Sequence, residues 1–250
     1  MKNILIAILF LLVGCQEKST EQEIVWEFSG FEKNDSLNPI LHPTASLSFE
    51  CPISNKKVAW EERNVLNPSA IVKDNKVYLF YRAQDINGTS RIGMAISLDG
   101  LRFKKSPAPV FYPDNDAMKI YEWNYKKIDN ESYLEDCISC YFDGVEDPRI
   151  VSTEDGCYLL TYTSYDGKTA RLCSAISKDL QNWIKLGPML ASPKYINMWS
   201  KSGALIGKEV NGHIIATKID GFYWMYFGDT DLFMAKSADL RNWEVCENAE

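Results

Sequence analysis

Residues 158–183 have the sequence YLLTYTSYDGKTARLCSAISKDLQNW, and the pattern in this stretch decides the fold. Two apolar runs, 158–163 and 171–177, flank a short polar tip, and the stretch closes on Asp179 and Trp183. Runs of this length, rich in Leu, Ile, Thr and Tyr and separated by a polar turn, predict a β-hairpin. We expect a further short strand, ending in Trp183, on the outer side of the hairpin.

The same pattern occurs in two other places, residues 77–103 and 222–243. Each copy contains Ser-x-Asp-x-x-x-aromatic, and each follows a short apolar run, at 69–72, 149–151 and 203–206. Four short strands per copy, with no convincing amphipathic helix between copies, favour an all-β chain of antiparallel four-stranded units, as in the blades of a β-propeller. A β-sandwich whose segments match by coincidence is the alternative.

A propeller would bring distant polar residues together. The first strand of every blade begins at one face, and the tip between the second and third strands opens toward that face. The first-strand entrances carry Asn67-Pro68, Glu146-Asp147-Pro148-Arg149 and Lys201-Ser202-Gly203, and the tips begin with Asp85, Asp166 and Asp229. We therefore expect these groups to converge on one ligand site.

The hexapeptide Gly144-Val145-Glu146-Asp147-Pro148-Arg149 places two carboxylates and a guanidinium at the entrance of an apolar strand. Because neighbouring side chains of an extended chain point to opposite faces, Glu146 and Asp147 are expected to face apart. Pro148 cannot donate a ladder hydrogen bond, which fits a first strand residue or an edge. The arrangement suits acid/base chemistry, and a solvated turn with one salt bridge is the alternative.

Residues 104–143 form a long insertion between the first and second copies. Connections of this length without structure of their own are usually functional or disordered. Its aromatic residues Tyr121, Trp123 and Tyr125 suit either the wall of a sugar subsite or packing of the loop onto the sheet, and the sequence leaves both open.

The composition argues against a nucleic-acid partner, because the chain has 34 acidic and 27 basic side chains and no basic run. Cys137 and Cys140 resemble half of a zinc site, but no second cysteine pair matches them and the only histidines are His42 and His213, so no metal is expected. In an exported protein, Cys137–Cys140 is a candidate disulfide. The cysteines expected to be buried as small apolar side chains are Cys157, Cys173 and Cys246.

Residues 1–15 have the features of an export signal. Lys2 precedes an apolar run that is too short to span a bilayer as a helix, and the segment ends in Leu12-Val13-Gly14-Cys15. This ending resembles a bacterial lipobox, which implies cleavage before Cys15 and a lipid on its thiol. The protein would then be exported and anchored to the outer membrane, periplasmic or at the cell surface, and an ordinary cleaved signal is the alternative. Residues 16–44 are expected to form a tether and N-terminal extension, and residues 45–250 the catalytic domain.

With these features together, the chain resembles glycoside hydrolase family 130. The resemblance rests on stretches that occur in the family's order: Asn67-Pro68-Ser69-Ala70, Tyr81-Arg82-Ala83 with Asp85, Ser90-Arg91-Ile92-Gly93, Glu146-Asp147-Pro148-Arg149 and Ser200-Lys201-Ser202-Gly203-Ala204. It implies a five-bladed β-propeller that cleaves β-mannosides by hydrolysis or by phosphorolysis. Five blades of about 50 residues do not fit into residues 45–250, so we expect about three blades in a C-terminally truncated chain.

The resemblance also implies roles for single residues. Asp147 matches the general acid that protonates the leaving sugar, and a neighbouring carboxylate such as Glu146, in a site closed to water, is expected to raise its pKa. Lys201 stands where phosphorylases place a lysine near phosphate. A salt bridge to a nearby aspartate is the alternative for each arginine. The residues expected to bind substrate are Asn67, Arg82, Asp85, Arg91, Glu146, Arg149 and Lys201.

In this family, hydrolysis and phosphorolysis both invert the configuration at the anomeric carbon, so the nucleophile needs space on the side of the sugar opposite the acid. The tip Gly228-Asp229-Thr230-Asp231 is acidic, which disfavours phosphate and favours hydrolysis, with Asp229 as the candidate base. The lipoprotein signal favours the family's β-1,2-mannosidase branch. We therefore expect a mannose-containing oligosaccharide or glycan as the substrate, and no cofactor. Two alternatives stay open: phosphorolysis, with inorganic phosphate as co-substrate and mannose 1-phosphate as product, and a non-catalytic, surface glycan-binding lipoprotein.

Overall fold

The computed structural model describes residues 34–129 and 141–247, and its contacts divide the chain into two parts, residues 1–35 and 36–250. The second part is all-β, as predicted, with two one-turn helices, α1 (Lys119–Glu122) and α2 (Lys126–Asp129). Within the described ranges, no helix is long and apolar enough to cross a membrane. The signal segment and Cys15 lie outside the described residues, so the lipid anchor stays a prediction.

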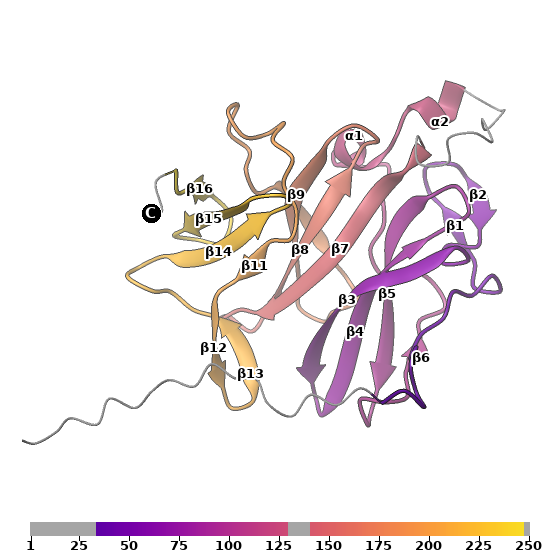
Figure 1. Ribbon diagram of the computed structural model, residues 1–250, viewed down its shortest axis with the longest axis horizontal. Helices are drawn as coiled ribbons and strands as arrows, with labels where there is room; N and C mark the ends of the chain where they lie inside the picture. The colour runs from indigo at the N-terminus through magenta and orange to yellow at the C-terminus, as the bar shows by residue number, and fades with distance from the viewer. Residues whose placement is uncertain (1–33, 130–140, 248–250) are drawn as a thin grey trace, which may run out of the picture. The chain divides into compact units, whose positions relative to one another are not determined.

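The three copies of the pattern form three sets of four antiparallel strands, here called the first, second and third repeats, which Figure 1 shows in succession from purple to yellow. The strands of the first are β3 (Asn64–Lys73), β4 (Lys76–Gln84), β5 (Thr89–Ser97) and β6 (Lys104–Lys105). Those of the second are β7 (Asp143–Ser152), β8 (Tyr158–Tyr165), β9 (Ala170–Ser177) and β10 (Ile184–Pro188). Those of the third are β11 (Ala204–Leu205), β14 (Tyr223–Gly228), β15 (Leu232–Ser237) and β16 (Trp243–Val245). The predicted hairpins are confirmed.

The Ser-x-Asp-x-x-x-aromatic motif forms the same turn in all three repeats. Asp99 Oδ1 accepts hydrogen bonds from two backbone N–H groups, at 2.9 and 2.8 Å, and the Ser97 hydroxyl binds the same turn. Asp179 and Asp239 bind the equivalent N–H groups in the other repeats. These backbone hydrogen bonds hold the pKa of all three aspartates well below the usual range. The prediction that each outer strand ends in the aromatic residue is wrong, because the turn occupies those positions and the strand lies at or after the aromatic.

A close approach of two backbones joins the first and second repeats. Thr89 and Ser90 of β5 pair in parallel with Asp143 and Gly144 at the start of β7. Gly144 has a φ of +112°, and a Cβ there would lie 2.1 Å from the Ser90 carbonyl oxygen, so this position requires glycine. The two repeats therefore share one sheet, in the order β10-β9-β8-β7-β5-β4-β3. The described residues contain three four-stranded sets, and the five-bladed propeller stays a prediction.

Two further hairpins lie outside the repeated pattern. Strand β1 (Phe49–Cys51) pairs with β2 (Lys56–Val58), and β12 (Gly207–Val210) pairs with β13 (His213–Ala216). The second of these hairpins also pairs with the end of β7, through Ile215. Because β12 is mostly exposed, it lacks the apolar run that would reveal it in the sequence.

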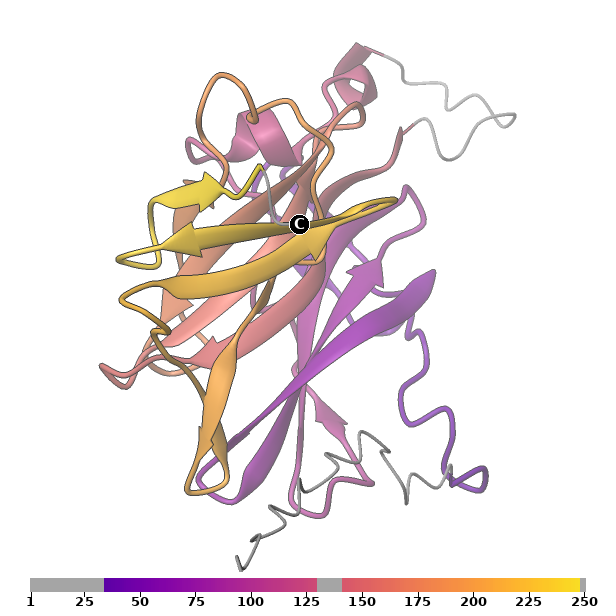
Figure 2. The same ribbon diagram turned by 60° about the vertical axis from the view of Figure 1, so that its left-hand side comes forward.

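The hydrophobic core lies between successive repeats. Phe80 of the first repeat and Leu160 of the second share one buried cluster, and Leu172 of the second repeat and Met225 of the third share another. Figure 2 shows the yellow strands of the third repeat beside the salmon strands of the second. The second repeat packs against the first repeat on one face and against the third on the other. Because alternate residues of a strand point to opposite faces, residues of both sets are buried, which explains its nearly continuous apolar runs.

The aromatic residues of the insertion divide between the two roles that the sequence left open. Tyr121 packs against the cluster between the first and second repeats, and Trp123 is only 7% exposed. Tyr125 is 47% exposed. Tyr121 therefore packs the insertion against the first two repeats, Trp123 is buried, and Tyr125 is the most exposed of the three.

Two buried glutamates fasten peripheral segments to the sheet in the same way. Glu122 of α1 accepts a hydrogen bond from the Tyr162 hydroxyl at 2.9 Å and pairs with Lys185 of β10. In the first repeat, Glu61 accepts from the equivalent Tyr81 and pairs with Lys105. Burial raises the pKa of Glu122 to about 7, against the opposing charge of Lys185. These acids are structural, because their partners surround them and no solvent reaches them.

The predicted burial of two cysteines is confirmed, because Cys157 and Cys173 are 8% and 0% exposed. Cys246 is only partly buried. Cys137 and Cys140 lie outside the described residues, so their disulfide stays a prediction. Among the residues that the structure describes, no group of three or more His, Cys, Asp or Glu side chains is placed to hold a metal ion.

Candidate active site

The entrance of β7, residues 144–149, carries the two adjacent carboxylates that the sequence singles out. The pairing of β7 with β8 shifts between Glu146 and Arg149, and Asp147 has a φ of +51°, so a bulge interrupts the strand here. A bulge turns a side chain out of the strict alternation of a strand. Glu146 and Asp147 therefore contact the same two cations, and the prediction that they face apart is wrong.

The same backbone bulge occurs at the entrance of β3. The pairing of β3 with β4 shifts between Leu66 and Ser69, and Asn67 has a φ of +49°. Asn67 Nδ2 donates a hydrogen bond of 2.6 Å to Asp147 Oδ1. The entrances of the first and second repeats thus meet side chain to side chain, which confirms their predicted convergence.

Arg82 of β4 connects both carboxylates. Its Nη2 lies 2.7 Å from Glu146 Oε1 and its Nη1 lies 3.5 Å from Asp147 Oδ1. Its Nε donates a hydrogen bond of 3.0 Å to the buried Ser90 hydroxyl, which in turn donates to Glu146 Oε1 at 3.4 Å. Ser90 is a site residue to which sequence reasoning assigned no role, although it stands in one of the stretches that carry the resemblance.

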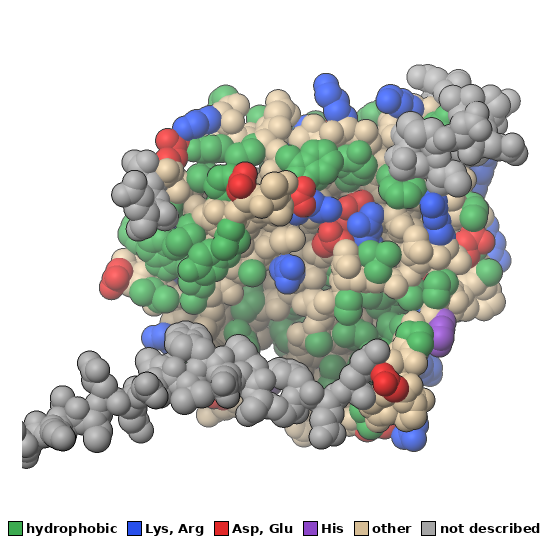
Figure 3. Space-filling model, viewed as in Figure 1, with side chains coloured by type: hydrophobic (Ala, Val, Ile, Leu, Met, Phe, Trp, Pro, Cys, Tyr) green, Lys and Arg blue, Asp and Glu red, His purple; other side chains and the backbone are tan. Residues whose placement is uncertain are grey.

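Lys201 adds a second cation from the segment that precedes β11. Its Nζ lies 3.6 Å from Glu146 Oε2 and 3.4 Å from Asp147 Oδ2. The Lys201 carbonyl accepts a hydrogen bond of 3.0 Å from the Gly228 N–H at the tip of the third repeat. All three predicted entrances therefore contribute to one cluster of charges. Figure 3 shows acidic and basic side chains gathered near the middle of the face, over the region where Figure 1 draws β7.

The two carboxyl groups have opposite pKa shifts. Burial raises the pKa of Glu146, although the Arg82 and Lys201 charges oppose it. Burial also acts to raise the pKa of Asp147, but the Asn67 hydrogen bond and the same two cations outweigh it and lower the pKa. The expectation of a raised Asp147 pKa is therefore wrong for this arrangement.

Asp85 and Arg91 form a separate ion pair. Arg91 Nη1 lies 2.7 Å from Asp85 Oδ2, and both residues are buried. The second repeat has the equivalent pair, Asp166 and Arg171, at 2.7 Å. Because the pair recurs at two hairpin tips, it serves to hold the tip in place, which is the salt-bridge alternative for Arg91. Substrate binding by Asp85 and Arg91 stays a prediction.

Arg149 and Asp229 are both exposed, and among the described residues the side chain of neither forms a hydrogen bond or an ion pair. Asp229 directly follows Gly228, whose N–H binds the Lys201 carbonyl, so the backbone places it next to the Lys201 segment. Its carboxylate does not join the cluster around Asp147. The roles of Arg149 in substrate binding and of Asp229 as base stay predictions.

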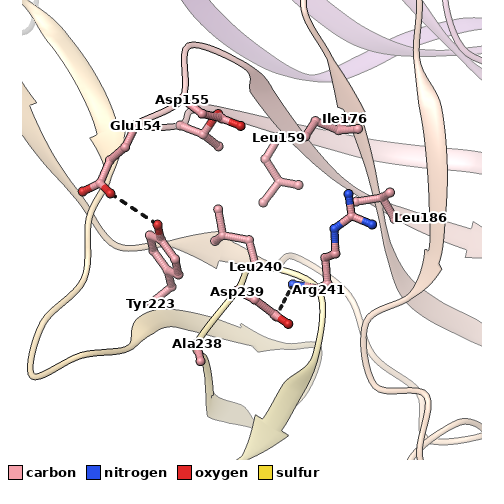
Figure 4. A pocket seen from close by; sticks show the side chains of 11 residues that line it. Glu154, Asp155, Leu159, Ile176, Leu186, Tyr223, Ala238, Asp239, Leu240 and Arg241 are labelled. Carbon is pink, nitrogen blue, oxygen red and sulfur yellow. Dashed lines mark hydrogen bonds between the residues drawn. The ribbon is translucent and has the colours of Figure 1, made fainter.

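A cavity of about 290 Å³ lies at the other end of β7. Figure 4 shows Glu154, Asp155, Tyr223 and Asp239 around it, where the turn after β7 meets the third repeat. Asp155 and Asp239 bind backbone N–H groups of their own turns. The entrance of β7 is the better candidate active site, because both of its carboxylates contact Arg82 of the first repeat and Lys201 of the segment before the third.

The family model of glycoside hydrolase family 130, described as beta-1,4-mannooligosaccharide phosphorylase, matches residues 31–248. A curated relative, the 1,2-beta-oligomannan phosphorylase of Thermoanaerobacter sp. (strain X514), is 30% identical over 194 residues, which cover 74% of this chain and 53% of the relative. This chain therefore spans about half the length of that relative.

Two solved structures are similar to the chain over most of its length. A glycosyl hydrolase from Bacteroides ovatus has a TM-score of 0.80 at 36% identity, covering 90% of this chain and 60% of that one. A second structure has a TM-score of 0.80 at 39% identity and the same coverage. It is described as belonging to the GH130 family of mannoside phosphorylases, which contains glycoside hydrolases that target beta-1,2 mannosidic linkages in Candida mannan.

Proposed function

Because this chain belongs to glycoside hydrolase family 130, we propose that it cleaves β-mannosidic bonds, with β-1,2-linked mannosides as substrates and Asp147 as the proton donor. The observation that carries the proposal is the convergence of Glu146 and Asp147 with Arg82 and Lys201 at one strand entrance. Two largely buried carboxyl groups that contact the same two cations are suited to general acid–base catalysis, in which a positioned carboxyl group donates or accepts a proton.

Asp147 is the proposed donor because it is the more accessible member of the pair. Its side chain is 14% exposed, against 5% for Glu146, and it stands on the bulge that turns it outward. Sugar hydroxyls that bind Asn67 and Lys201 would withdraw these groups from Asp147, and its pKa would then rise toward the value that a proton donor needs. Glu146 keeps Arg82 and Lys201 in position.

We propose hydrolysis as the form of the reaction because of the charges at the site, although the family model and the curated relative are both described as phosphorylases. The two cations already face two carboxylates, so the cluster has little positive charge left for a phosphate dianion. The exposed, acidic Asp229 and Asp231 add further repulsion and suit the activation of a water molecule. The 39% identical structure, whose description includes hydrolases of β-1,2-mannosidic linkages, supports the same choice.

Phosphorolysis is the second candidate, since the family description and the curated relative are both phosphorylases. Lys201 and Arg82 at the entrance of β7, with the exposed Arg149 two residues after Asp147, are the cations available to a phosphate. The test is to incubate the protein with β-1,2-mannobiose, with and without inorganic phosphate, and to identify the products. We expect mannose without phosphate. Mannose 1-phosphate that forms only with phosphate would replace hydrolysis by phosphorolysis, and binding without any product would favour a glycan-binding protein.

We also propose that the protein is exported and lipid-anchored through Cys15. The support is the sequence of residues 1–15, with a positive start, an apolar run and Leu12-Val13-Gly14-Cys15 at its end. The test is metabolic labelling with a radioactive fatty acid in a Gram-negative host. Label on the wild type and none on Cys15→Ser is expected, and equal labelling of both proteins would refute the anchor.

A further inference from the structure

Two aromatic side chains, Tyr165 and Trp199, stand near the carboxylate cluster, and the sequence motifs assign no binding role to either of them. Trp199 is 44% exposed, in the segment between the second and third repeats. Its ring centroid lies 5.8 Å from that of Tyr165, at an interplanar angle of 63°. Tyr165 is the last residue of β8 and is partly buried.

Backbone pairing and electrostatics place both rings at the entrance of β7. Tyr165 is the Cα partner of Gly144, two residues before Glu146. Burial raises the pKa of the Tyr165 hydroxyl, and the charge of Glu146 adds to this shift while that of Lys201 opposes it, so the phenol lies within their electrostatic reach. Trp199 is two residues before Lys201, whose Nζ lies 3.4 Å from Asp147 Oδ2.

The segment that carries Trp199 is held on both sides. Ser200 N–H donates to the Ala170 carbonyl at 3.0 Å, and the Ser200 hydroxyl accepts from Leu172 N–H at 3.0 Å. Arg171 Nε donates to the Ile196 carbonyl at 2.9 Å. An indole that is exposed and yet mounted on a fixed segment loses little conformational entropy when a ligand packs against it.

We propose that Trp199, supported by Tyr165, is the hydrophobic wall of a sugar subsite next to Asp147, where one pyranose ring of the substrate packs its C–H face on the indole. A pyranose presents an apolar face and a rim of hydroxyls, and this place offers an aromatic face beside carboxylates and cations that bind hydroxyls. The inference rests on the proposed function and adds to it a residue that determines substrate affinity. It also assigns to Trp199 the role that the sequence offered to Tyr121, Trp123 and Tyr125, of which Tyr121 packs against the core and Trp123 is buried.

The test compares Trp199→Ala and Trp199→Phe with Phe222→Ala. Phe222 is a matched control, because it is 36% exposed and lies six residues from Gly228, at the opposite end of β14 from the Lys201 contact. KM and kcat for β-1,2-mannobiose are measured for each variant. We expect Trp199→Ala to raise KM about five- to tenfold with little change in kcat, and Trp199→Phe to stay within about threefold of the wild type. Phe222→Ala should behave as the wild type.

An unchanged KM in Trp199→Ala, or an equal rise in Phe222→Ala, would overturn the subsite. Failure of the proposed function is separate: it shows as a wild type that releases no sugar from β-mannosides. In that case, isothermal titration calorimetry of the wild type and Trp199→Ala with manno-, gluco- and galacto-configured disaccharides decides whether the subsite exists. Binding to the wild type that weakens in Trp199→Ala supports it, and binding to both proteins alike, or to neither, refutes it.

Discussion

The dipeptide Glu-Asp occurs at the entrance of β7 and again in the turn that follows this strand, and the two pairs have different chemistry. At the entrance, Glu146 and Asp147 lie in a bulge, largely buried, against Arg82 and Lys201. In the turn that follows the strand, Glu154 and Asp155 are exposed, and Asp155 accepts hydrogen bonds from Thr153 and from the Cys157 N–H. The comparison teaches that the residue types do not determine the chemistry. Burial and charged partners from other repeats do.

The largest effect should come from removing the carboxylate at the entrance. We expect Asp147→Asn to lower kcat for β-1,2-mannobiose about 10³-fold, because the amide cannot donate a proton to the leaving oxygen. Asp155→Asn is the matched control at the other end of β7 and should leave kcat within about twofold of the wild type. Equal losses in the two variants, or full activity of Asp147→Asn, would remove the assignment of the acid.

The two glycines near the ends of β7 allow the same comparison for stability. We expect Gly144→Ala to destabilise the fold by about 3 kcal/mol or more, since φ is +112° and the new Cβ would lie 2.1 Å from the Ser90 carbonyl. Gly156 has a φ of +78° with nothing within 4 Å of its Cβ position, so Gly156→Ala should cost about 1 kcal/mol. Urea unfolding measures the free energy of unfolding of both variants. Similar losses would show that backbone strain, and not the close approach to Ser90, determines the cost.

Glu122 is a buried acid outside the candidate active site, so it shows what burial alone does to a carboxyl group. Glu122 has an ordinary pKa of 4.5 that burial raises to about 7, so the folded state holds a proton that the unfolded state releases. Stability should therefore fall as pH rises from about 4.5 to about 7, by about 3 kcal/mol from this residue alone. Glu122→Gln, measured by urea unfolding at pH 5 and pH 7.5, should lose most of this dependence. An unaltered pH dependence would contradict the assignment.

The smallest effect should come from Asn67, which stands on the bulge of β3 that is equivalent to the Asp147 bulge of β7. Its hydrogen bond favours the ionised form of Asp147, so Asn67→Ala should raise the pKa of that carboxyl. If Asp147 is the acid, the alkaline limb of the kcat/KM profile, which reports the free enzyme, should move to higher pH. A shift toward lower pH, or no shift in an otherwise active variant, would mean that another group controls this limb.

Much of the fold could be predicted from the sequence, because hairpins are local. The apolar runs of residues 158–163 and 171–177 form β8 and β9, and the repeat then located the equivalent strands on either side. The β12–β13 hairpin was missed, although the Asn211-Gly212 turn that joins its strands is a strong hairpin signal. The outer strands were misplaced for a local reason too, because the Asp99, Asp179 and Asp239 turns occupy the positions before them.

The sequence predicted which residues form the candidate site better than it predicted how their side chains are oriented. The repeat brought together Asn67, Asp147 and Lys201, which the structure places in contact. Strict strand alternation put Glu146 and Asp147 on opposite faces, and a bulge reversed this. Trp199 gave no signal, because a single tryptophan in an irregular segment is common and only its neighbours in space give it a role.

By itself, the sequence determined the all-β class, the three repeats and the strand entrance that carries Glu-Asp-Pro-Arg, because periodicity and turn chemistry act over a few residues. The tertiary structure alone decided which acid is buried, which cations face it and in which direction its pKa shifts. Desolvation and charge pairing depend on distances between residues far apart in the chain, and those distances exist only once Arg82, Asp147 and Lys201 lie in one cluster.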